Sequence, residues 1–121
     1  MEKERVNLYL ELISEFENRC FEICKMLTKL TPEYKYINTF WIDGNEVCGR
    51  GEETWRYGGF EEHLLEFPIS YLTMDNKELQ NIIDEKVREK EEQKRKAEEK
   101  REQQKIQKEK EEYERLKAKF G

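Results

Sequence analysis

The feature that most limits the fold of this chain is a long C-terminal segment of charged and amide side chains, with no proline and no glycine before Gly121. Glu, Lys, Arg and Gln dominate this segment, and all four are strong helix formers. Asp75 is a suitable N-cap, and Glu78 three residues later completes the pattern of a capping box. We therefore predict one helix from Asn76 onward, about 44 residues and roughly 65 Å long.

Apolar side chains occur only near the two ends of this predicted helix. Between Lys90 and Lys105 the sole apolar residue is Ala97, so the middle of the helix stays in solvent and depends on i,i+4 charge pairs. Because helices owe most of their stability to packing, we expect the two apolar groups to join two copies of the chain in a homodimer. The main contact is predicted at Leu79, Ile82, Ile83 and Val87, and a secondary contact at Ile106, Tyr113, Leu116 and Phe120.

Each apolar group also has an alternative explanation. The first group can fold back on the sheet of its own chain instead of meeting a second copy. The second group fits a coiled-coil heptad, but two heptads are too few to sustain a coiled coil. It is therefore also consistent with a solvated helix that frays near its end.

Only the preceding residues, 1–74, are able to enclose a core. The protein has 121 residues, and 42% of them are charged, against about 25% in typical proteins. Up to Leu79 there are 9 Lys/Arg and 16 Asp/Glu, whereas from Gln80 onward 14 Lys/Arg accompany 12 Asp/Glu. We therefore predict two parts, an acidic α+β region (1–74) and a long charged helix (75–121). A core of roughly 75 residues is marginal without a partner or an oligomer.

The α+β region begins with an amphipathic helix, predicted from Lys3 to Lys29. Its apolar residues recur at steps of three and four, the spacing that lays one face on a core. Thr31 ends the helix, because the residue before a proline is disfavoured in helical geometry. The residues expected on the buried face are Val6, Tyr9, Leu10, Ile13, Phe16, Cys20, Ile23, Cys24, Leu27 and Leu30.

Three predicted strands follow the helix, and they form an antiparallel meander against it, which makes the fold class α+β. Turn signals separate the strands at Asp43–Asn45 and at Gly58–Gly59. Gly49 and Gly51 share a face of the second strand, which indicates a bulge or a close approach by another segment. The strands are predicted from Tyr34 to Ile42, from Glu46 to Tyr57 and from Phe60 to Phe67.

The sequence does not favour an enzyme. It has one histidine, His63, and it contains no nucleophile elbow, zinc-protease, P-loop or dinucleotide motif. Three cysteines and His63 suit a Cys₃His zinc site by residue type. However, the C-x-x-C spacing is missing, and Cys20 and Cys24 fall in the expected core stripe, so we predict no metal and no cofactor.

The N-terminal residues contain no continuous apolar run, so we expect neither a signal peptide nor a membrane span. The odd, small number of cysteines, which are Cys20, Cys24 and Cys48, is typical of a reducing compartment with free thiols. Together these properties predict a cytoplasmic protein.

Two pairs of glutamates flank the predicted Gly58–Gly59 turn, and in a hairpin they face each other. Like charges directly opposite in a sheet are destabilising. A protein that keeps such a patch is able to use it against a basic partner, such as a nucleic-acid-binding surface, and not against nucleic acid itself. The alternative is an ordinary solvated face that prevents sheet aggregation. The four residues are Glu52, Glu53, Glu61 and Glu62.

The same segment holds Trp55, Arg56 and Tyr57, three residue types that are enriched at binding hot spots. If they lie in a strand, Trp55 and Tyr57 share a face and Arg56 points the other way. The α+β region has more aromatic side chains than one helix is able to cover. We therefore expect some to be partly exposed or covered by a second copy of the protein, and we predict these three residues as anchors for a partner.

The segment from Glu52 to Leu72 resembles small accessory proteins encoded by phages and other mobile elements of low-GC bacteria. The shared pattern is W-x-Y-G-G followed by F-P-x-x-Y-L, and no catalytic residue comes with it. The resemblance implies a host-interaction role, for which anti-CRISPR and other anti-defence inhibitors, often small, acidic and non-enzymatic, are the precedent. The matching residues are Trp55, Tyr57, Gly58, Gly59, Phe67, Pro68, Tyr71 and Leu72.

These observations predict a non-enzymatic protein that binds and inhibits or modulates a nucleic-acid-handling or defence complex in the cytoplasm of a host bacterium. One alternative is a structural scaffold that assembles through its long helix. Another is a sponge that sequesters a nucleotide signal between protomers. In that case Arg50 and Arg56 contact phosphate, Trp41 or Trp55 stacks on a base, and the amides of Gly49, Gly51 and Gly58 approach the ligand closely.

Overall fold

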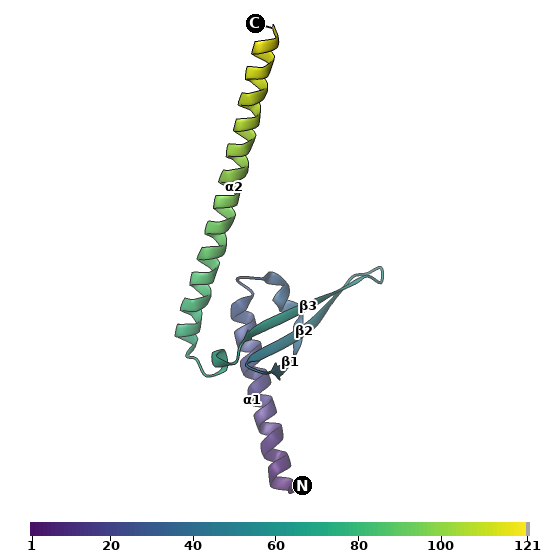
Figure 1. The fold of residues 1–121 in the computed structure, drawn as a ribbon. Coiled ribbons are helices and arrows are strands. Elements are labelled where there is room, and N and C mark those ends of the chain that lie inside the picture. Colours follow the sequence, from purple (N-terminus) through teal and green to yellow (C-terminus); the bar gives the residue numbers. More distant parts are fainter. Residues whose placement is uncertain (121) are drawn as a thin grey trace. The chain divides into compact units, whose positions relative to one another are not determined.

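The structure, a computed structural model, describes residues 1–120 and confirms the predicted α+β fold. The chain forms two compact units, a body from Met1 to Asp84 and a second unit that begins at Glu85. Figure 1 shows an N-terminal helix, a three-stranded sheet and a long C-terminal helix. The elements are α1 (Lys3–Leu27), η1 (Pro32–Tyr36), β1 (Ile37–Asp43), β2 (Glu46–Thr54), β3 (Phe60–Pro68), η2 (Ile69–Leu72) and α2 (Asn76–Phe120).

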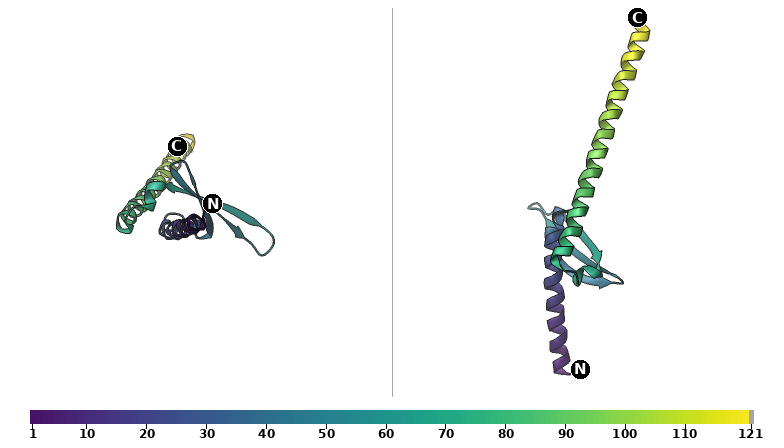
Figure 2. Two further views of the ribbon diagram at one scale, coloured as in Figure 1. Left: turned by 90° about the horizontal axis from the view of Figure 1, so that it is seen from below. Right: turned by 90° about the vertical axis from the view of Figure 1, so that its left-hand side faces the viewer.

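Helix α1 covers one face of the sheet with its second half only. Cys20, Ile23, Cys24 and Leu27 are buried there, as the periodicity predicts. The expected burial of the first half is wrong, because α1 extends past the edge of the sheet and no other part of the body lies against it (Figures 1 and 2). The exposed apolar side chains of the first half are Val6, Leu8, Tyr9, Leu10 and Leu12.

The sheet is antiparallel with strand order β1-β2-β3, so β2 lies in the centre. Val47 of β2 pairs with Phe67 of β3, and both side chains are buried on the face that packs against α1. Because side chains alternate along a strand, the neighbouring positions point to the opposite face. No described element of the body covers that opposite face, and it carries Trp41 and Leu64, which are 43% and 62% exposed.

The two glycines of β2 permit a close approach by the neighbouring segment, as predicted. The register shifts between Ile37 and Thr39, which pair with Gly51 and Arg50, so β1 contains one extra residue opposite β2. At this bulge a Cβ on Gly51 would lie 1.8 Å from the carbonyl oxygen of Tyr36. A side chain at this position is therefore excluded by the backbone of the neighbouring segment.

The first strand starts later than predicted. Residues 34–36 belong to the 3-10 helix η1, which begins at Pro32. Proline is favoured in the first turn of a helix, because its φ angle suits the turn and its missing N–H is not needed there. The aromatic residues that suggested a strand here thus fold into a helical turn.

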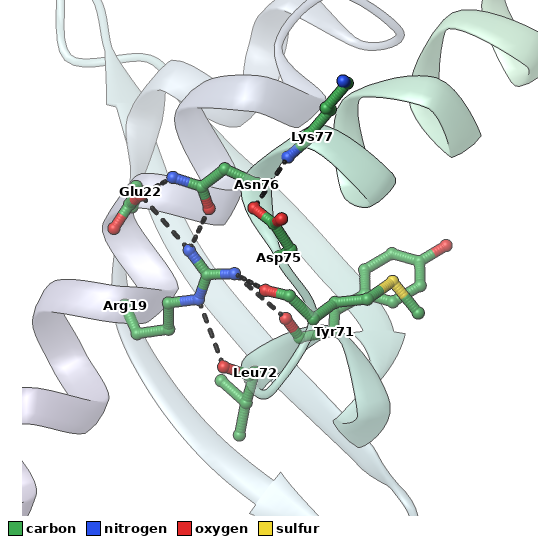
Figure 3. A network of polar contacts seen from close by, with 8 residues as sticks. Arg19, Glu22, Tyr71, Leu72, Asp75, Asn76 and Lys77 are labelled. Carbon is green, nitrogen blue, oxygen red and sulfur yellow. Dashed lines mark hydrogen bonds and ion pairs between the residues drawn. The ribbon is translucent and has the colours of Figure 1, made fainter.

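Arg19 of α1 ties the helix to the segment between β3 and α2 (Figure 3). Its guanidinium donates hydrogen bonds to the carbonyl oxygens of Leu72 at 3.2 Å and Met74 at 2.6 Å, and to the side chain of Asn76. It also forms an ion pair with Glu22 at 3.2 Å. These two carbonyl groups lie at the end of η2 and just after it. The Arg19 guanidinium supplies the hydrogen-bond donors for both.

Helix α2 begins as predicted at an Asp75 cap, whose carboxylate accepts a hydrogen bond from the Lys77 backbone N–H at 3.2 Å (Figure 3). Leu79 and Ile83 are completely buried in the body, whereas Ile82 and Val87 are partly exposed. Leu79 and Ile83 therefore fold back on the body of their own chain. Leu79 and Ile83 offer no surface to a second copy, which removes them from the predicted dimer contact.

Candidate functional site

The hairpin formed by β2 and β3 brings together the two predicted glutamate pairs. Glu52 lies directly opposite Glu62, and Glu53 lies directly opposite Glu61. Because successive residues alternate in direction, the first pair belongs to the open face of the sheet and the second to the face that packs against α1. The hairpin thus carries opposed carboxylates on both of its faces.

On the open face, a single arginine separates the opposed carboxylates. The guanidinium of Arg50 binds Glu52 at 2.7 Å and Glu62 at 2.8 Å. All three side chains are about half exposed, so the ion pairs are screened by water and contribute modestly to stability. Their main effect is to hold the two glutamates in fixed positions. The sequence analysis did not foresee this role of Arg50.

On the inner face, His63 takes the place that Arg50 has on the other side. Its Nε2 lies 3.0 Å from a carboxylate oxygen of Glu53, and the hydroxyl of Tyr36 donates to the other oxygen at 3.2 Å. The Tyr36 and His63 rings stack with centroids 5.4 Å apart. The hydrogen bond from His63 is the main reason that the pKa of Glu53 is lowered, and partial burial opposes this shift.

The tip of the hairpin is a loop of residues 55–59, not the two-residue turn predicted at Gly58–Gly59. The Trp55 N–H donates to the carbonyl oxygen of Gly59 at 2.9 Å, and the Gly58 N–H donates to that of Trp55 at 3.1 Å. Only Gly58 has a positive φ, +84°. A two-residue turn of type I′ needs positive φ at both central residues, so the loop opens earlier and β2 ends at Thr54.

The predicted anchors Trp55, Arg56 and Tyr57 therefore lie in the loop, and the predicted shared strand face of Trp55 and Tyr57 is wrong. Trp55 and Tyr57 are among the aromatic side chains of the body that are exposed, as expected for some of them. Tyr57 is 97% exposed and Trp55 is 50% exposed, and Phe60 beside them is 65% exposed. In Figures 1 and 2 the loop projects beyond the rest of the sheet. The hairpin thus ends in aromatic side chains that no described residue of the body covers.

Two further exposed apolar residues continue this surface along the open face. Leu64 pairs with Arg50, and Trp41 pairs with Cys48. Phe60 and Leu64 were not predicted as surface residues of the site, although the alternation of residues 60–67 indicates their exposure. Leu65 and Phe67 are buried. Because side chains alternate along a strand, the even-numbered positions Phe60 and Leu64 face away from the core. The candidate surface, named here the hairpin surface, consists of Trp41, Glu52, Trp55, Arg56, Tyr57, Phe60, Glu62 and Leu64.

The second predicted group for self-association lies on α2 in the unit that begins at Glu85. Its four side chains are between 47% and 80% exposed. Tyr113, Leu116 and Phe120 are spaced by three and four residues, and together with Lys117 they line one apolar hollow. They remain available to a partner or a second copy, and the contact predicted at Ile106, Tyr113, Leu116 and Phe120 stays a prediction.

The cysteines do not form the zinc site considered from the sequence. Cys20, Cys24 and Cys48 are free and buried, and burial raises the pKa of both Cys20 and Cys24 to about 11. Within residues 1–120, the only group of three metal-ligating side chains within reach of one another is Glu53, Glu61 and His63. No described helix is both long enough and apolar enough to cross a membrane.

Within one chain, the residues named for the nucleotide sponge are divided between the sheet and the loop at the tip of the hairpin. Gly49 and Gly51 are buried in the sheet, against the side chain of Ile37 and the backbone of Tyr36. Arg50 is occupied by two glutamates. Gly58 and Arg56 lie apart from them in the loop.

The chain matches no protein-family model, no curated protein and no solved structure. What remains to indicate a function is the geometry of the hairpin surface and the chemistry of its side chains.

Proposed function

We propose that this protein is a non-enzymatic binding protein that presents its β2–β3 hairpin to a basic surface of a nucleic-acid-handling or defence complex of a host bacterium, and so inhibits or modulates that complex. The observation that carries the proposal is the exposure of Tyr57, Trp55 and Phe60 at the end of a hairpin whose sides carry opposed glutamates. Such a combination offers apolar anchors together with charge that attracts a cationic partner.

The aromatic tip favours binding over a purely solvated hairpin. Tyrosine and tryptophan supply large contact areas for few rotatable bonds, and they dominate binding hot spots. The two backbone hydrogen bonds of Trp55 hold the loop in one shape before any partner arrives. A preformed loop loses less conformational entropy on binding, which increases affinity.

The acidic sides of the hairpin select the charge of the partner. Arg50 neutralises only part of the charge of Glu52 and Glu62, while Glu61 and Glu66 are exposed and form no ion pair among the described residues. A negative surface repels nucleic acid and attracts the basic grooves that bind it. This charge pattern supports a protein partner with a nucleic-acid-binding surface.

The resemblance of residues 52–72 to phage and mobile-element accessory proteins supports the same class of function. Within this class, anti-CRISPR and other anti-defence inhibitors act on host complexes in the bacterial cytoplasm. We therefore place the protein and its partner in that compartment as part of the proposal.

The proposal is tested by capture from the lysate of a low-GC bacterium with the immobilised full-length chain. The wild-type chain is compared with a Trp55→Ala/Tyr57→Ala variant and with a variant in which Glu52, Glu53, Glu61 and Glu62 are all Gln. Both variants should lose the captured protein, and capture by the wild type should weaken with salt. If the Gln variant captures the same protein with the same salt dependence, the acidic surface is not the binding site.

A second candidate function is a scaffold that assembles through α2, and it is favoured by the exposed apolar face of Tyr113, Leu116 and Phe120. The two functions differ in the part of the chain that they need. Light scattering on a chain that ends near Val87 separates them, because removal of the helix end abolishes assembly only if α2 mediates it.

A further inference from the structure

Three side chains on the inner face of the β2–β3 hairpin converge on one point from two strands. Glu53 lies on β2, and Glu61 and His63 lie on β3. Their ligand atoms all lie within 4.8 Å of one another. We infer that Glu53, Glu61 and His63 form a binding site for a single divalent transition-metal ion of the zinc type.

The donor set suits such an ion. Zinc binds imidazole nitrogen and carboxylate oxygen, and an imidazole favours transition metals over calcium and magnesium, which prefer oxygen alone. Two ligand atoms at about 2.0–2.2 Å from one zinc ion lie roughly 3.3 Å apart in tetrahedral geometry. His63 Nε2 and the nearer Glu53 oxygen are already 3.0 Å apart. Glu61 is exposed, so its side chain is free to turn toward them.

The surroundings hold two of the three ligands in place. The side chain of His63 is only 10% exposed, and its ring is stacked on Tyr36 with an interplanar angle of 16°. The Tyr36 hydroxyl donates to the Glu53 oxygen that does not face His63. Hydrogen bonds to a ligating carboxylate and a fixed imidazole orientation are typical of metal sites, because they orient the ligands before the ion binds.

The distribution of cations on the hairpin is a separate observation that points to an ion. The open-face pair Glu52 and Glu62 is bridged by Arg50. The inner pair Glu53 and Glu61 is opposed in the same way, yet within residues 1–120 neither carboxylate forms an ion pair with a lysine or an arginine. A metal ion between the two carboxylates supplies the missing positive charge.

The site is accessible and has room for water. A hollow of about 270 Å³ opens beside Glu53 and Glu61 and is lined by Lys35 and Tyr36 among other residues. Three protein ligands leave at least one position on a zinc ion for water or for a donor atom of a bound molecule. The inference does not depend on the proposed host partner, because an ion binds here in the isolated chain.

The experiment titrates the purified full chain with Co²⁺, followed by its visible absorption, and with Zn²⁺, followed by calorimetry. Binding of one ion per chain is expected. Glu61→Gln should weaken Zn²⁺ binding by at least about tenfold. Glu62→Gln is the matched control, since it removes the same charge from the adjacent residue, which belongs to the other face. It should leave Zn²⁺ binding within about twofold. Glu61 is exposed, so its replacement does not endanger the fold.

Three results would overturn the inference. The first is no binding of one ion per chain at metal concentrations up to about 1 mM. The second is an equal loss of affinity in Glu61→Gln and Glu62→Gln, which means that general surface charge attracts the ion. The third is an intense near-ultraviolet band of the Co²⁺ complex, which means that the ligands are thiolates of the cysteines and not these three residues.

Discussion

Trp55 and Gly59 close the tip of the hairpin together. The N–H of Trp55 donates to the carbonyl oxygen of Gly59 at 2.9 Å, and the Trp55 ring lies so close to Gly59 that a Cβ there would be 3.0 Å from it. The hydrogen bond and the contact with Gly59 therefore fix the position of the Trp55 indole within the loop. The indole is half exposed. Together with the exposed rings of Tyr57 and Phe60 it belongs to the hairpin surface.

Gly58 is the residue at which the loop conformation is most sensitive to substitution. Its φ of +84° is unfavourable for any residue with a Cβ, although nothing lies within 4 Å of a Cβ built there. Gly58→Ala should destabilise the chain by about 1–2 kcal/mol in urea unfolding. Gly44, with φ of +62° in the β1–β2 turn, is the matched control. Both variants should lose similar stability, but only Gly58→Ala should weaken capture of a host partner. An equal effect on capture would show that the tip has no special role.

Arg50 should stabilise the hairpin by separating Glu52 from Glu62. Arg50→Gln leaves these two carboxylates facing each other with no cation between them, and like charges directly opposite destabilise a sheet. The midpoint of thermal unfolding should fall. A second change, Glu62→Gln, should restore part of the loss, and this recovery measures the repulsion directly. Arg56→Gln in the loop is the control and should leave the midpoint unchanged.

Arg19 should be required at the junction between α1 and η2. Arg19→Gln removes the donors for the carbonyl oxygens of Leu72 and Met74, and a partly buried acceptor left unpaired costs about 1–3 kcal/mol. Arg19→Lys should lose most of the same stability, since one ammonium group cannot reproduce the planar fork of a guanidinium. Arg5→Gln, on the exposed first half of α1, should change the stability little. Chemical unfolding followed by circular dichroism measures all three.

The buried cysteines should make the protein less stable in alkaline solution. Burial raises the pKa of Cys20 and Cys24 from 9.0 to about 11, so between these values the unfolded chain releases protons that the folded chain keeps. Stability conferred by the protonated thiols is therefore complete below pH 9 and is lost as the pH rises toward 11. The urea midpoint should fall over this range, and it should fall less in a Cys20→Ala/Cys24→Ala variant. Equal slopes would contradict the assignment.

Self-association stays a prediction, and the buried side chains of Leu79 and Ile83 no longer belong to its expected contact. Leu116→Asp should convert a dimer to a monomer without changing the helix content, because Leu116 is half exposed. Ile83→Asp should instead unfold the body, since Ile83 is completely buried. Sedimentation equilibrium at micromolar concentration measures both. A wild-type chain that is monomeric under these conditions would contradict the dimer.

The elements of this fold follow from local patterns in the sequence. Asp75 marks the start of α2, because its capping bond is made by a neighbouring residue. The alternation of residues 60–67 likewise predicts β3 and its pairing, and the facing positions of Glu52 and Glu62 follow from the hairpin alone. Each of these features depends on residues that are close in the chain.

Several features that escaped prediction depend on contacts between distant segments. Arg19 looks like one more polar residue of α1 until the carbonyl oxygens of η2 are placed beside it. The same holds for His63, which acquires its role from Glu53 and Tyr36. The exposed first half of α1 carries the same periodicity as the buried half, and only the extent of the sheet decides where burial ends.

The most direct test of the proposed function is the affinity of the purified chain for the host protein that it captures, measured by calorimetry for the wild type and for Trp55→Ala/Tyr57→Ala. The proposal predicts a loss of at least about tenfold for this variant, and an affinity within about twofold of the wild type for Tyr113→Ala/Phe120→Ala on α2. Equal affinity of the wild type and the hairpin variant would contradict the proposal that the hairpin surface is the binding site.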